Sequence, residues 1–526
     1  MAEEAEIWQP KFNPWLIAVV VALAAFMEVL DTSIANVALP HMAGDLGASN
    51  DESTWVLTSY LVSNAIVLPL SGWLAGLFGR KRFFLLCISL FTVSSLLCGI
   101  APTLPMLIFF RVIQGLGGGG LQPMAQAILA DTFPPQKRGL AFALYGITTI
   151  LAPTIGPTLG GWLTDNYSWR WIFYINLPVG IMTLFLVLRT VEDPPYIARN
   201  RDAGVRVDYI GIGLLALGVG ALQVLLDKGQ EEDWFGSHFI VVLAVVCVIS
   251  LVSLVFWELH TKTPVIDMRM FKSFNFAVAC LMIFFLGMLL FSSLVMMPQF
   301  LQTLMGYTAE SAGLVLSGAS LIILLEMPIV GQLTTKVPAK YIMAFGWICL
   351  AFGMYYSTRD LDLLISFRSA SRLRMVQAFG LGFLFVPITL SAYIGVPAEK
   401  GNNVSGLVNF MRNIGSSVGT SMVTTVLARR EQFHQSVLAY HATGYDPAFR
   451  DQLNGLSGQL FHAGASPPDA QAQAYGRIYQ SMQAQAQTLA YLDTYKVLAI
   501  AAGVMFLLAF LVRRNDPASG GHVVAE

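Results

Sequence analysis

Apolar runs of roughly 20 residues alternate with short polar turns along almost the whole chain. An α-helix rises about 1.5 Å per residue, so a run of this length crosses the hydrocarbon core of a bilayer. The runs predict fourteen membrane-spanning helices, at 15–39, 54–78, 83–102, 105–130, 139–163, 170–189, 208–227, 237–258, 274–301, 310–333, 340–358, 370–396, 403–428 and 490–512. We therefore expect an all-α polytopic membrane protein.

Two motifs recur at a spacing close to 260 residues. RVIQGLG begins at Arg111 and RMVQAFG at Arg374, while PLSGWL begins at Pro69 and PIVGQL at Pro328. Apolar helices can resemble one another by chance, but two motifs at nearly one spacing favour a parallel duplication of six spans around a midplane cavity. The predicted organisation is a terminal segment, a six-helix bundle, a linker with two inserted helices, a second six-helix bundle and a tail, at 1–14, 15–190, 191–273, 274–512 and 513–526.

The distribution of positive charge predicts how the chain is oriented in the membrane. Lys and Arg concentrate in alternate short loops, and positively charged loops stay in the cytoplasm, so we expect both termini there. This pattern rests on positions that include Arg80, Lys81, Arg82, Lys137, Arg138, Arg199, Arg201, Arg206, Arg513 and Arg514. The exception is the start of the twelfth span, where Arg359, Arg368 and Arg372 would lie on the outer side.

Composition excludes several other classes of protein. Hydrophobic residues make up 55% of the chain and charged residues 12%, and a formal net charge of −1 gives no sign of a nucleic-acid partner. The first apolar run is too long for a cleavable signal peptide. The five cysteines fall in apolar runs without paired short spacings, so neither a disulfide framework nor a metal site is predicted.

One long polar segment, 429–489, is expected on the outer side. It has Pro, Gly and Asn breaks, followed by an Ala- and Gln-rich stretch from Pro467 that favours helix. A loop of this length is usually functional or disordered. It is therefore either a docking hairpin for a periplasmic or extracellular partner or a solvated loop.

The first span carries two acids, Glu28 and Asp31. A carboxylate at that depth costs at least ~2.5–3.5 kcal/mol on insertion scales, so it marks a functional site by default. Three residues apart, the two acids share a helix face, with Cβ atoms about 5–6 Å apart. Such a pair in a water-poor site can take up and release a proton near neutral pH. The alternative is an acid paired only for helix packing.

Arg111 in the fourth span lies at a depth that matches Asp31, about 9 Å and about 12 Å below the outer surface by the helical rise. An arginine stays charged when buried, so we expect an ion pair that parts when Asp31 is protonated. Proton binding would then bias the equilibrium between inward-facing and outward-facing states. A static salt bridge that sets helix register is the alternative.

Further residues inside the spans are candidate cavity or gating positions. Repeated glycine and proline in the fifth span allow close helix approach and kinks. Arg412 is expected near the midplane and Glu326 nearer the cytoplasmic side. The full set is Asn36, Gln114, Gly146, Pro153, Gly156, Pro157, Glu326, Asn409 and Arg412.

The segment LDTSIANVALP, which begins at Leu30, resembles the first-span signature of the fourteen-span drug:proton antiporters of the major facilitator superfamily. Segments beginning at Arg111 and Gly146 are similar to the fourth-span motif and the antiporter motif of that family. GWLAGLFGRKR resembles its cytoplasmic loop motif, with Gly76 where the family usually has an acid and with matches at Gly72, Gly79, Arg80 and Lys81.

The resemblance implies the major facilitator fold, with two six-helix bundles plus two inserted helices. It also implies proton-coupled efflux of hydrophobic drugs by alternating access across the inner membrane, with the proton as coupling ion and no other cofactor. The implied partners are a periplasmic membrane-fusion adaptor and an outer-membrane channel.

Two other functions stay open. The same fold could carry a single metabolite, siderophore or sugar. A membrane-embedded enzyme or a receptor is the second alternative, but neither a Ser-His-Asp arrangement nor metal-ligand spacing is found. ATP-driven pumping is disfavoured because the chain has no GxxxxGK[ST] loop.

Overall fold

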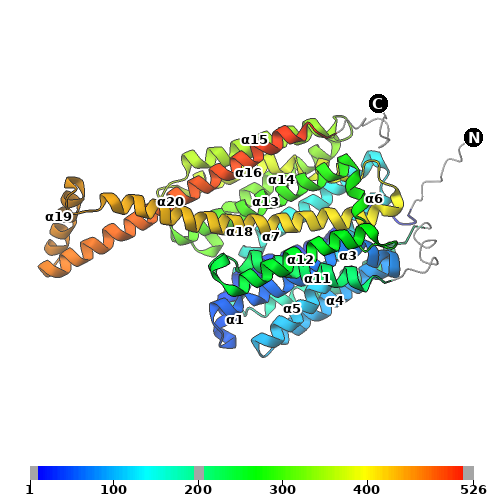
Figure 1. Ribbon diagram of the computed structural model, residues 1–526, viewed down its shortest axis with the longest axis horizontal. Helices are drawn as coiled ribbons and strands as arrows, with labels where there is room; N and C mark the ends of the chain where they lie inside the picture. Colours follow the sequence, from blue (N-terminus) through cyan, green and yellow to red (C-terminus); the bar gives the residue numbers. More distant parts are fainter. Residues whose placement is uncertain (1–9, 195–206, 513–526) are drawn as a thin grey trace, which may run out of the picture.

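The computed structural model describes residues 10–194 and 207–512, and every regular element in those ranges is a helix. Most helices run side by side along the long axis, and α1 begins near the end of the molecule at which α20 finishes (Figure 1). Parts of the predicted organisation lie outside these ranges. They are most of segment 1–14, part of the linker, the tail 513–526, and the basic residues Arg199, Arg201, Arg206, Arg513 and Arg514.

The N-terminal half forms one bundle. α1 packs along α7 and also contacts α6 and α9, while α5 packs against both α3 and α4. The long apolar runs build these helices, and the glycine-rich stretch after α5 separates it from α6. The bounds are α1 (Pro14–Leu46), α2 (Asn50–Ser53), α3 (Trp55–Phe78), α4 (Arg80–Ile100), α5 (Leu104–Gly118), α6 (Leu121–Thr132), α7 (Pro135–Asn166), α8 (Trp171–Tyr174) and α9 (Asn176–Thr190).

The two inserted helices, α11 (Tyr209–Lys228) and α12 (His238–His260), pack against each other. Only α11 contacts the bundles extensively, through α3 and α18. α12 is almost uniformly apolar and keeps most of its surface exposed, as expected for a helix that faces lipid. Short 3₁₀ turns flank it at Trp234–Gly236 and Met268–Lys272.

The C-terminal half forms the second bundle. In it α13 packs along α18, α14 along α16, and α15 along both α16 and α20. The two halves meet where α7 contacts α14 and where α18 contacts α3 and α6. The bounds are α13 (Phe274–Thr303), α14 (Ala309–Leu333), α15 (Ala339–Asp360), α16 (Phe367–Gly382), α17 (Phe385–Ala392), α18 (Gly401–His441), α19 (Pro447–His462) and α20 (Pro467–Ala509), with a 3₁₀ turn at Ala398–Lys400.

Twelve helices of the described ranges are long and apolar enough to cross a membrane, so the predicted count of fourteen spans is not confirmed. The two remaining predicted spans, 340–358 and 403–428, do form helices, α15 and α18. Their composition is more polar. For α18 the reason is packing, because this helix lies among α3, α6, α13 and α20 and faces protein rather than lipid.

The outer segment 429–489 is a helical hairpin. α18 continues without a break to His441, α19 crosses the tip, and α20 begins at Pro467 and runs back into the bundle (Figure 1). The predicted helix from Pro467 is therefore confirmed. A small apolar core of Leu453, Leu460, Ala470 and Ala474 holds α19 against α20. At the base, Arg430 on α18 pairs with Asp493 on α20 at 2.5 Å.

Candidate functional site

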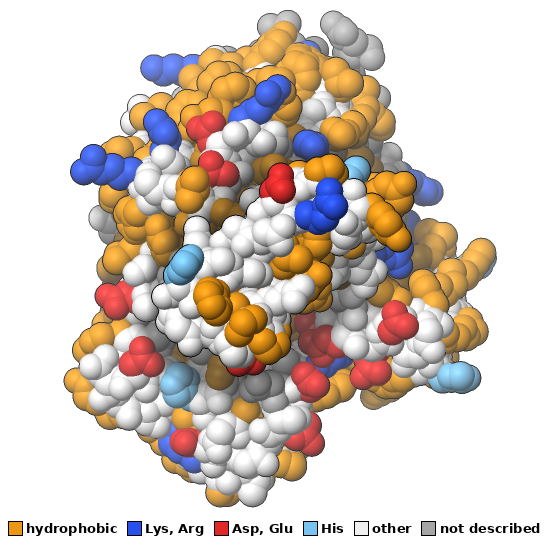
Figure 2. All heavy atoms as spheres, turned by 90° about the vertical axis from the view of Figure 1, so that its left-hand side faces the viewer, with side chains coloured by type: hydrophobic (Ala, Val, Ile, Leu, Met, Phe, Trp, Pro, Cys, Tyr) orange, Lys and Arg blue, Asp and Glu red, His pale blue; other side chains and the backbone are white. Residues whose placement is uncertain are grey.

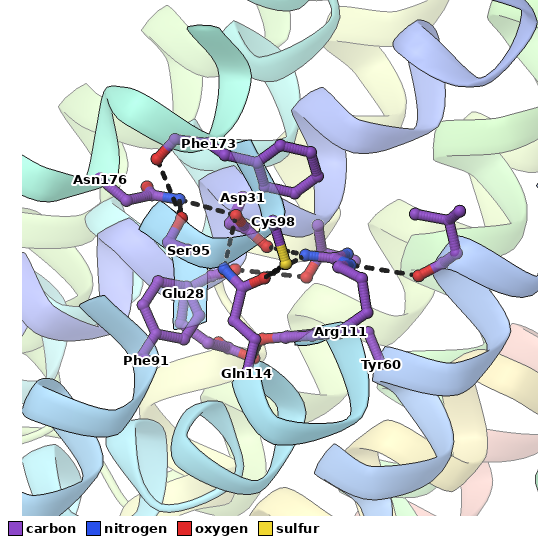
Figure 3. Close-up of polar contacts among 12 residues, drawn as sticks. Glu28, Asp31, Tyr60, Phe91, Ser95, Cys98, Arg111, Gln114, Phe173 and Asn176 are labelled. Carbon is purple, nitrogen blue, oxygen red and sulfur yellow. Dashed lines mark hydrogen bonds and ion pairs between the residues drawn. The ribbon is translucent and has the colours of Figure 1, made fainter. Parts of the chain in front are cut away.

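The two acids of α1 are buried in the N-terminal bundle. Asp31 is 2% exposed and Glu28 is 4% exposed, and the structure surrounds them with polar side chains from neighbouring helices (Figure 3). A charge or polar group at this depth needs hydrogen-bond partners, because burial separates it from bulk water. The two carboxylates have different partners and share no hydrogen bond with each other.

Asp31 accepts hydrogen bonds from three donors on two other helices. Arg111 Nη1 donates to Oδ2 at 2.6 Å, Gln114 Nε2 to Oδ1 at 3.0 Å, and Asn176 Nδ2 to Oδ1 at 2.7 Å. The ion pair predicted from matching depth is confirmed. All three partners are donors, and the two carboxylate oxygens of Asp31 accept from them.

Arg111 is fully enclosed, with 0% exposure. Nε donates to the carbonyl of Val56 at 3.1 Å, and Nη1 also donates to Gln114 Oε1 at 2.9 Å. The guanidinium carbon lies 4.3 Å from the ring centre of Tyr60 and 5.5 Å from that of Phe173. The aromatic rings exclude water, and in such surroundings the loss of one partner of an ion pair costs about 3–5 kcal/mol.

Glu28 belongs to a second network one turn away. It accepts from Tyr60 Oη at 3.2 Å, from Asn64 Nδ2 at 3.0 Å, and from Gln122 Nε2. Tyr60 connects the two networks, because its ring stacks under Arg111 while its hydroxyl donates to Glu28. Tyr60 therefore couples the two acids: a change of charge at Asp31 or Glu28 alters the interactions of the same tyrosine side chain.

Gln122 carries the second network across to the C-terminal half. Its Oε1 accepts from Tyr145 Oη at 3.2 Å and from Arg412 of α18. One turn further along α6, Gln126 and Asn409 of α18 exchange amide hydrogen bonds, the shorter at 2.8 Å. Arg412 and Asn409, both predicted cavity or gating residues, thus lie where the two halves meet.

The predicted glycine–proline cluster of α7 lies against the same turn of α1. Pro157 has no N–H, so the carbonyl of Pro153 lacks its helical donor, and Ser33 Oγ from α1 donates to that carbonyl at 3.1 Å. Gly156 makes the contact possible, since a Cβ there would lie 2.3 Å from Ser33 Oγ. At Gly146 a Cβ would lie 3.0 Å from Phe385 of α17, so α7 also approaches the other half closely.

The predicted loop motif lies between α3 and α4. Gly79 has φ 87°, a conformation that favours glycine, and Gly72 is covered by Asn403 of α18. Arg80 pairs with Asp131 at the end of α6, and the amide of Lys81 donates to Asp193 at 2.7 Å. Asp131 supplies an acid to this cluster from another helix, although Gly76 stands where the loop motif usually has one.

Two predicted residues lie apart from these networks. Asn36 is exposed on α1. Glu326 is 7% exposed and points toward Gly382 of α16, and neither carboxylate oxygen has a hydrogen-bond partner within residues 10–194 and 207–512. The geometry leaves the role of each as a prediction.

Sequence reasoning missed several residues that complete the networks: Tyr60, Asn64, Gln122, Asp131 and Asn176. Each is a polar residue inside an apolar run or at its end, which is the signal that could have found them. Tyr60 and Asn64 are also spaced four apart, so they share one face of α3.

Comparison with known proteins agrees with this architecture. The family model described as Major Facilitator Superfamily matches residues 21–420. The chain is 37% identical over 508 residues to the Multidrug export protein EmrB of Escherichia coli (strain K12), covering 96% of each chain. It is 41% identical over 450 residues to the Multidrug export protein EmrB of Haemophilus influenzae, covering 84% of this chain and 87% of that one.

The fold is also found among solved structures. The proton:xylose symporter XylE superposes with a TM-score of 0.59 at 13% identity, over 96% of this chain and 97% of XylE. This likeness shows a shared fold. Together these matches identify a multi-pass membrane transporter rather than an enzyme. The chain belongs to the Major Facilitator Superfamily.

Proposed function

We propose that this transporter exports hydrophobic, drug-like compounds in exchange for protons, by alternating access. The relatives named as multidrug export proteins support the substrate class. The buried pair of Asp31 and Arg111 carries the coupling part of the proposal, because it is a titratable acid held beside a permanent cation inside the N-terminal bundle.

The coupling step follows from the hydrogen bonds. Protonation of Asp31 removes its attraction to Arg111, and the three donors around the carboxylate lose much of their interaction. The turn of α1 that carries Asp31 also carries Ser33, which is bonded to α7. α7 in turn packs along α14 of the other half, so a shift of this turn alters the contact between the halves.

The energies decide how far the pair can separate. One proton crossing 100 mV supplies ~2.3 kcal/mol, whereas stripping a buried arginine of its partner costs about 3–5 kcal/mol. The energy of one proton is therefore too small to leave Arg111 without any hydrogen-bond acceptor when Asp31 is protonated. Gln114 Oε1 and the Val56 carbonyl already accept from Arg111 and remain when Asp31 is neutral, which lowers that cost.

Drug-dependent proton flux in proteoliposomes tests the proposal. Asp31→Asn keeps the shape and removes the titration, so we expect drug binding to persist and drug-driven proton flux to be lost. Asp45→Asn is the matched control, because Asp45 lies on the same helix, is exposed, and bonds only to Trp169 in the described ranges. Normal coupling in Asp31→Asn would remove Asp31 from the mechanism.

We further infer that α15 and α18 complete fourteen crossings of the inner membrane, with both termini in the cytoplasm. α15 supports this with an exposed apolar stripe at helical spacing: Tyr341, Phe345, Ile348, Phe352 and Tyr355. In a cysteine-free background, Thr443→Cys should react with an impermeant maleimide added outside intact inner membranes, and Glu399→Cys should not. The reverse pattern would contradict the orientation.

The outer hairpin is our candidate docking surface for a periplasmic adaptor that leads to an outer-membrane channel. Hydrophobic side chains gather on its projecting tip (Figure 2), where Tyr440 is 79% exposed, Tyr445 96% and Phe461 52%. Lipid does not explain them, because the hairpin extends beyond the bundle (Figure 1).

Copurification of a periplasmic membrane-fusion adaptor coexpressed with this transporter tests that surface. Replacing Tyr440 and Tyr445 by Ser should abolish copurification, while Gln452→Ser, an exposed change on the same hairpin, should not. Because neither tyrosine belongs to the core of the hairpin, the fold should survive both changes. Undiminished copurification of the double tyrosine variant would overturn this assignment.

A further inference from the structure

The C-terminal half repeats the arginine site of the N-terminal half. Arg374 on α16 donates from Nη1 to Gln377 Oε1 at 3.0 Å, as Arg111 does to Gln114 at 2.9 Å. Gln377 Nε2 then donates to Ser357 on α15 at 2.8 Å. The equivalent residues Arg111 and Arg374, Gln114 and Gln377, Ser95 and Ser357 lie 262 or 263 residues apart.

One member of the site differs between the two halves. The residue 262 positions after Asp31 is Ser293 on α13, and Arg374 Nη1 donates to its hydroxyl at 2.8 Å. A neutral serine therefore stands where the first half has a carboxylate. No acidic side chain within residues 10–194 and 207–512 lies within ion-pair distance of Arg374.

The guanidinium is nevertheless buried, with Arg374 only 2% exposed, and its Nε has no hydrogen-bond partner in the described part of the chain. A buried cation without a counter-charge is among the most costly arrangements in a protein interior. Tyr495 of α20 interacts electrostatically with Arg374 and is fully buried. Its hydroxyl has no well-formed hydrogen bond within the described ranges, so it is a further donor at this site.

The end of the bundle at which α16 begins carries exposed positive charge. Arg374 is seven residues into α16, which places it about 10 Å inside by the helical rise. At the same end, Arg359, Arg368 and Arg372 are exposed, against two aspartates, Asp360 and Asp362. These are the arginines that depart from the positive-inside pattern, and they raise the local concentration of anions at the outer mouth of the bundle.

We propose that the C-terminal bundle binds one small monovalent anion, a halide such as chloride, beside Arg374. The anion supplies the negative charge that Asp31 supplies in the other half. Arg374 Nε and the Tyr495 hydroxyl, which have no hydrogen-bond partner in the described part of the chain, are donor groups, and donors suit an anion rather than a metal ion. One guanidinium balances one negative charge, which favours a halide over phosphate.

Thermal unfolding of the purified full-length protein tests the site without relying on transport. Chloride is exchanged for gluconate at constant ionic strength. A ligand that binds only the folded state raises the folded-to-unfolded ratio about tenfold when its concentration is about ten times its dissociation constant. We expect the wild type to show a saturable, chloride-specific rise in unfolding temperature, with bromide acting in the same way.

Two variants place the effect at Arg374. Ser293→Asp supplies a carboxylate at the position equivalent to Asp31, and Arg374→Met removes the charge at similar length. Either variant should unfold at the same temperature in chloride and in gluconate, and each should be more stable than the wild type in gluconate. Arg368→Met, an exposed change on the same helix, is the matched control and should keep the chloride effect.

Two results would overturn the proposal. One is a wild-type protein that unfolds at the same temperature in both salts. The other is a chloride effect that survives in a folded Ser293→Asp or Arg374→Met protein. If Ser293→Asp fails to fold, Arg374→Met decides the question by itself.

Discussion

The close contact between α1 and α7 predicts that one added methyl group, in Gly156→Ala, will force the two helices apart. Gly156→Ala adds a Cβ that would lie 2.3 Å from Ser33 Oγ and 2.5 Å from Ser33 Cβ. The hydroxyl cannot simply turn away, because it donates to the carbonyl of Pro153. The Cβ of Ser33 is fixed to the backbone, so the two helices must move apart.

The magnitude follows from one stabilising and two destabilising effects. Alanine in place of glycine inside a helix favours the helix by about 0.8–1.0 kcal/mol. Overpacking a closely packed contact costs typically 1–3 kcal/mol, and a buried carbonyl left without a donor adds about 1–3 kcal/mol. Gly161→Ala is the matched control on the same helix, because its added Cβ would have only Val37 Cγ1 within reach, at 4.0 Å.

We expect Gly161→Ala to be neutral or stabilising and Gly156→Ala to be less stable than Gly161→Ala by roughly 1–3 kcal/mol or more. Thermal unfolding in detergent measures the difference in stability, and drug-driven proton flux measures the effect on coupling. Gly156→Ala should also slow transport, since Ser33 lies two residues from Asp31. Equal stability and equal flux of the two variants would refute the idea that this close contact matters.

Three further predictions follow from the same networks. Asp131→Ala removes the carboxylate partner of Arg80, which is 2% exposed, so the unfolding free energy should fall by about 3–5 kcal/mol, whereas Asp193→Ala should have a smaller effect in the same thermal assay. Gln122→Leu removes the amide that connects Glu28 to Arg412, so the two halves should separate more often. Distances between spin labels on α6 and α18 should then show a larger long-distance population, and an unchanged distance distribution would contradict this. Leu460→Asp places a charge in the small core of the hairpin, so hydrogen exchange should rise in α19 and the adjoining part of α20 while the bundle keeps its protection, and Gln452→Asp should change neither.

Depth along a helix could be predicted from the sequence, because the helical rise is a constant. Asp31 and Arg111 were expected at matching depth, and they form a 2.6 Å pair. The same holds for Pro153 and Gly156, where the backbone chemistry of glycine and proline favours a close helix contact. These predictions need only the position of each residue along its own helix.

Partners from other helices could not be predicted in this way. Asn176 reaches Asp31 only because α9 lies beside α1, and Gln122 reaches Arg412 only because α6 and α18 meet between the halves. Which helices are neighbours, and how each is rotated about its axis, depends on the whole bundle. The predicted span 403–428 forms α18 but is not among the twelve candidate spans for a related reason, since a helix covered by protein can carry polar residues that a lipid-facing helix cannot.

The difference between the two halves bears on where the proton acts. Both copies of the repeat keep the arginine and the glutamine, but only the first has a titratable acid next to them. If any acid beside this arginine could couple, moving the carboxylate with Asp31→Ser and Ser293→Asp together would preserve drug-driven proton flux. We expect the flux to be lost. Around Asp31 the structure adds Asn176 and the Ser33 bond to a proline carbonyl of α7, whereas the second site has Tyr495 of α20, which interacts electrostatically with Arg374. Retained flux in a folded double variant would show that the acid and arginine alone suffice, and that the helix contact at Ser33 is not part of the coupling.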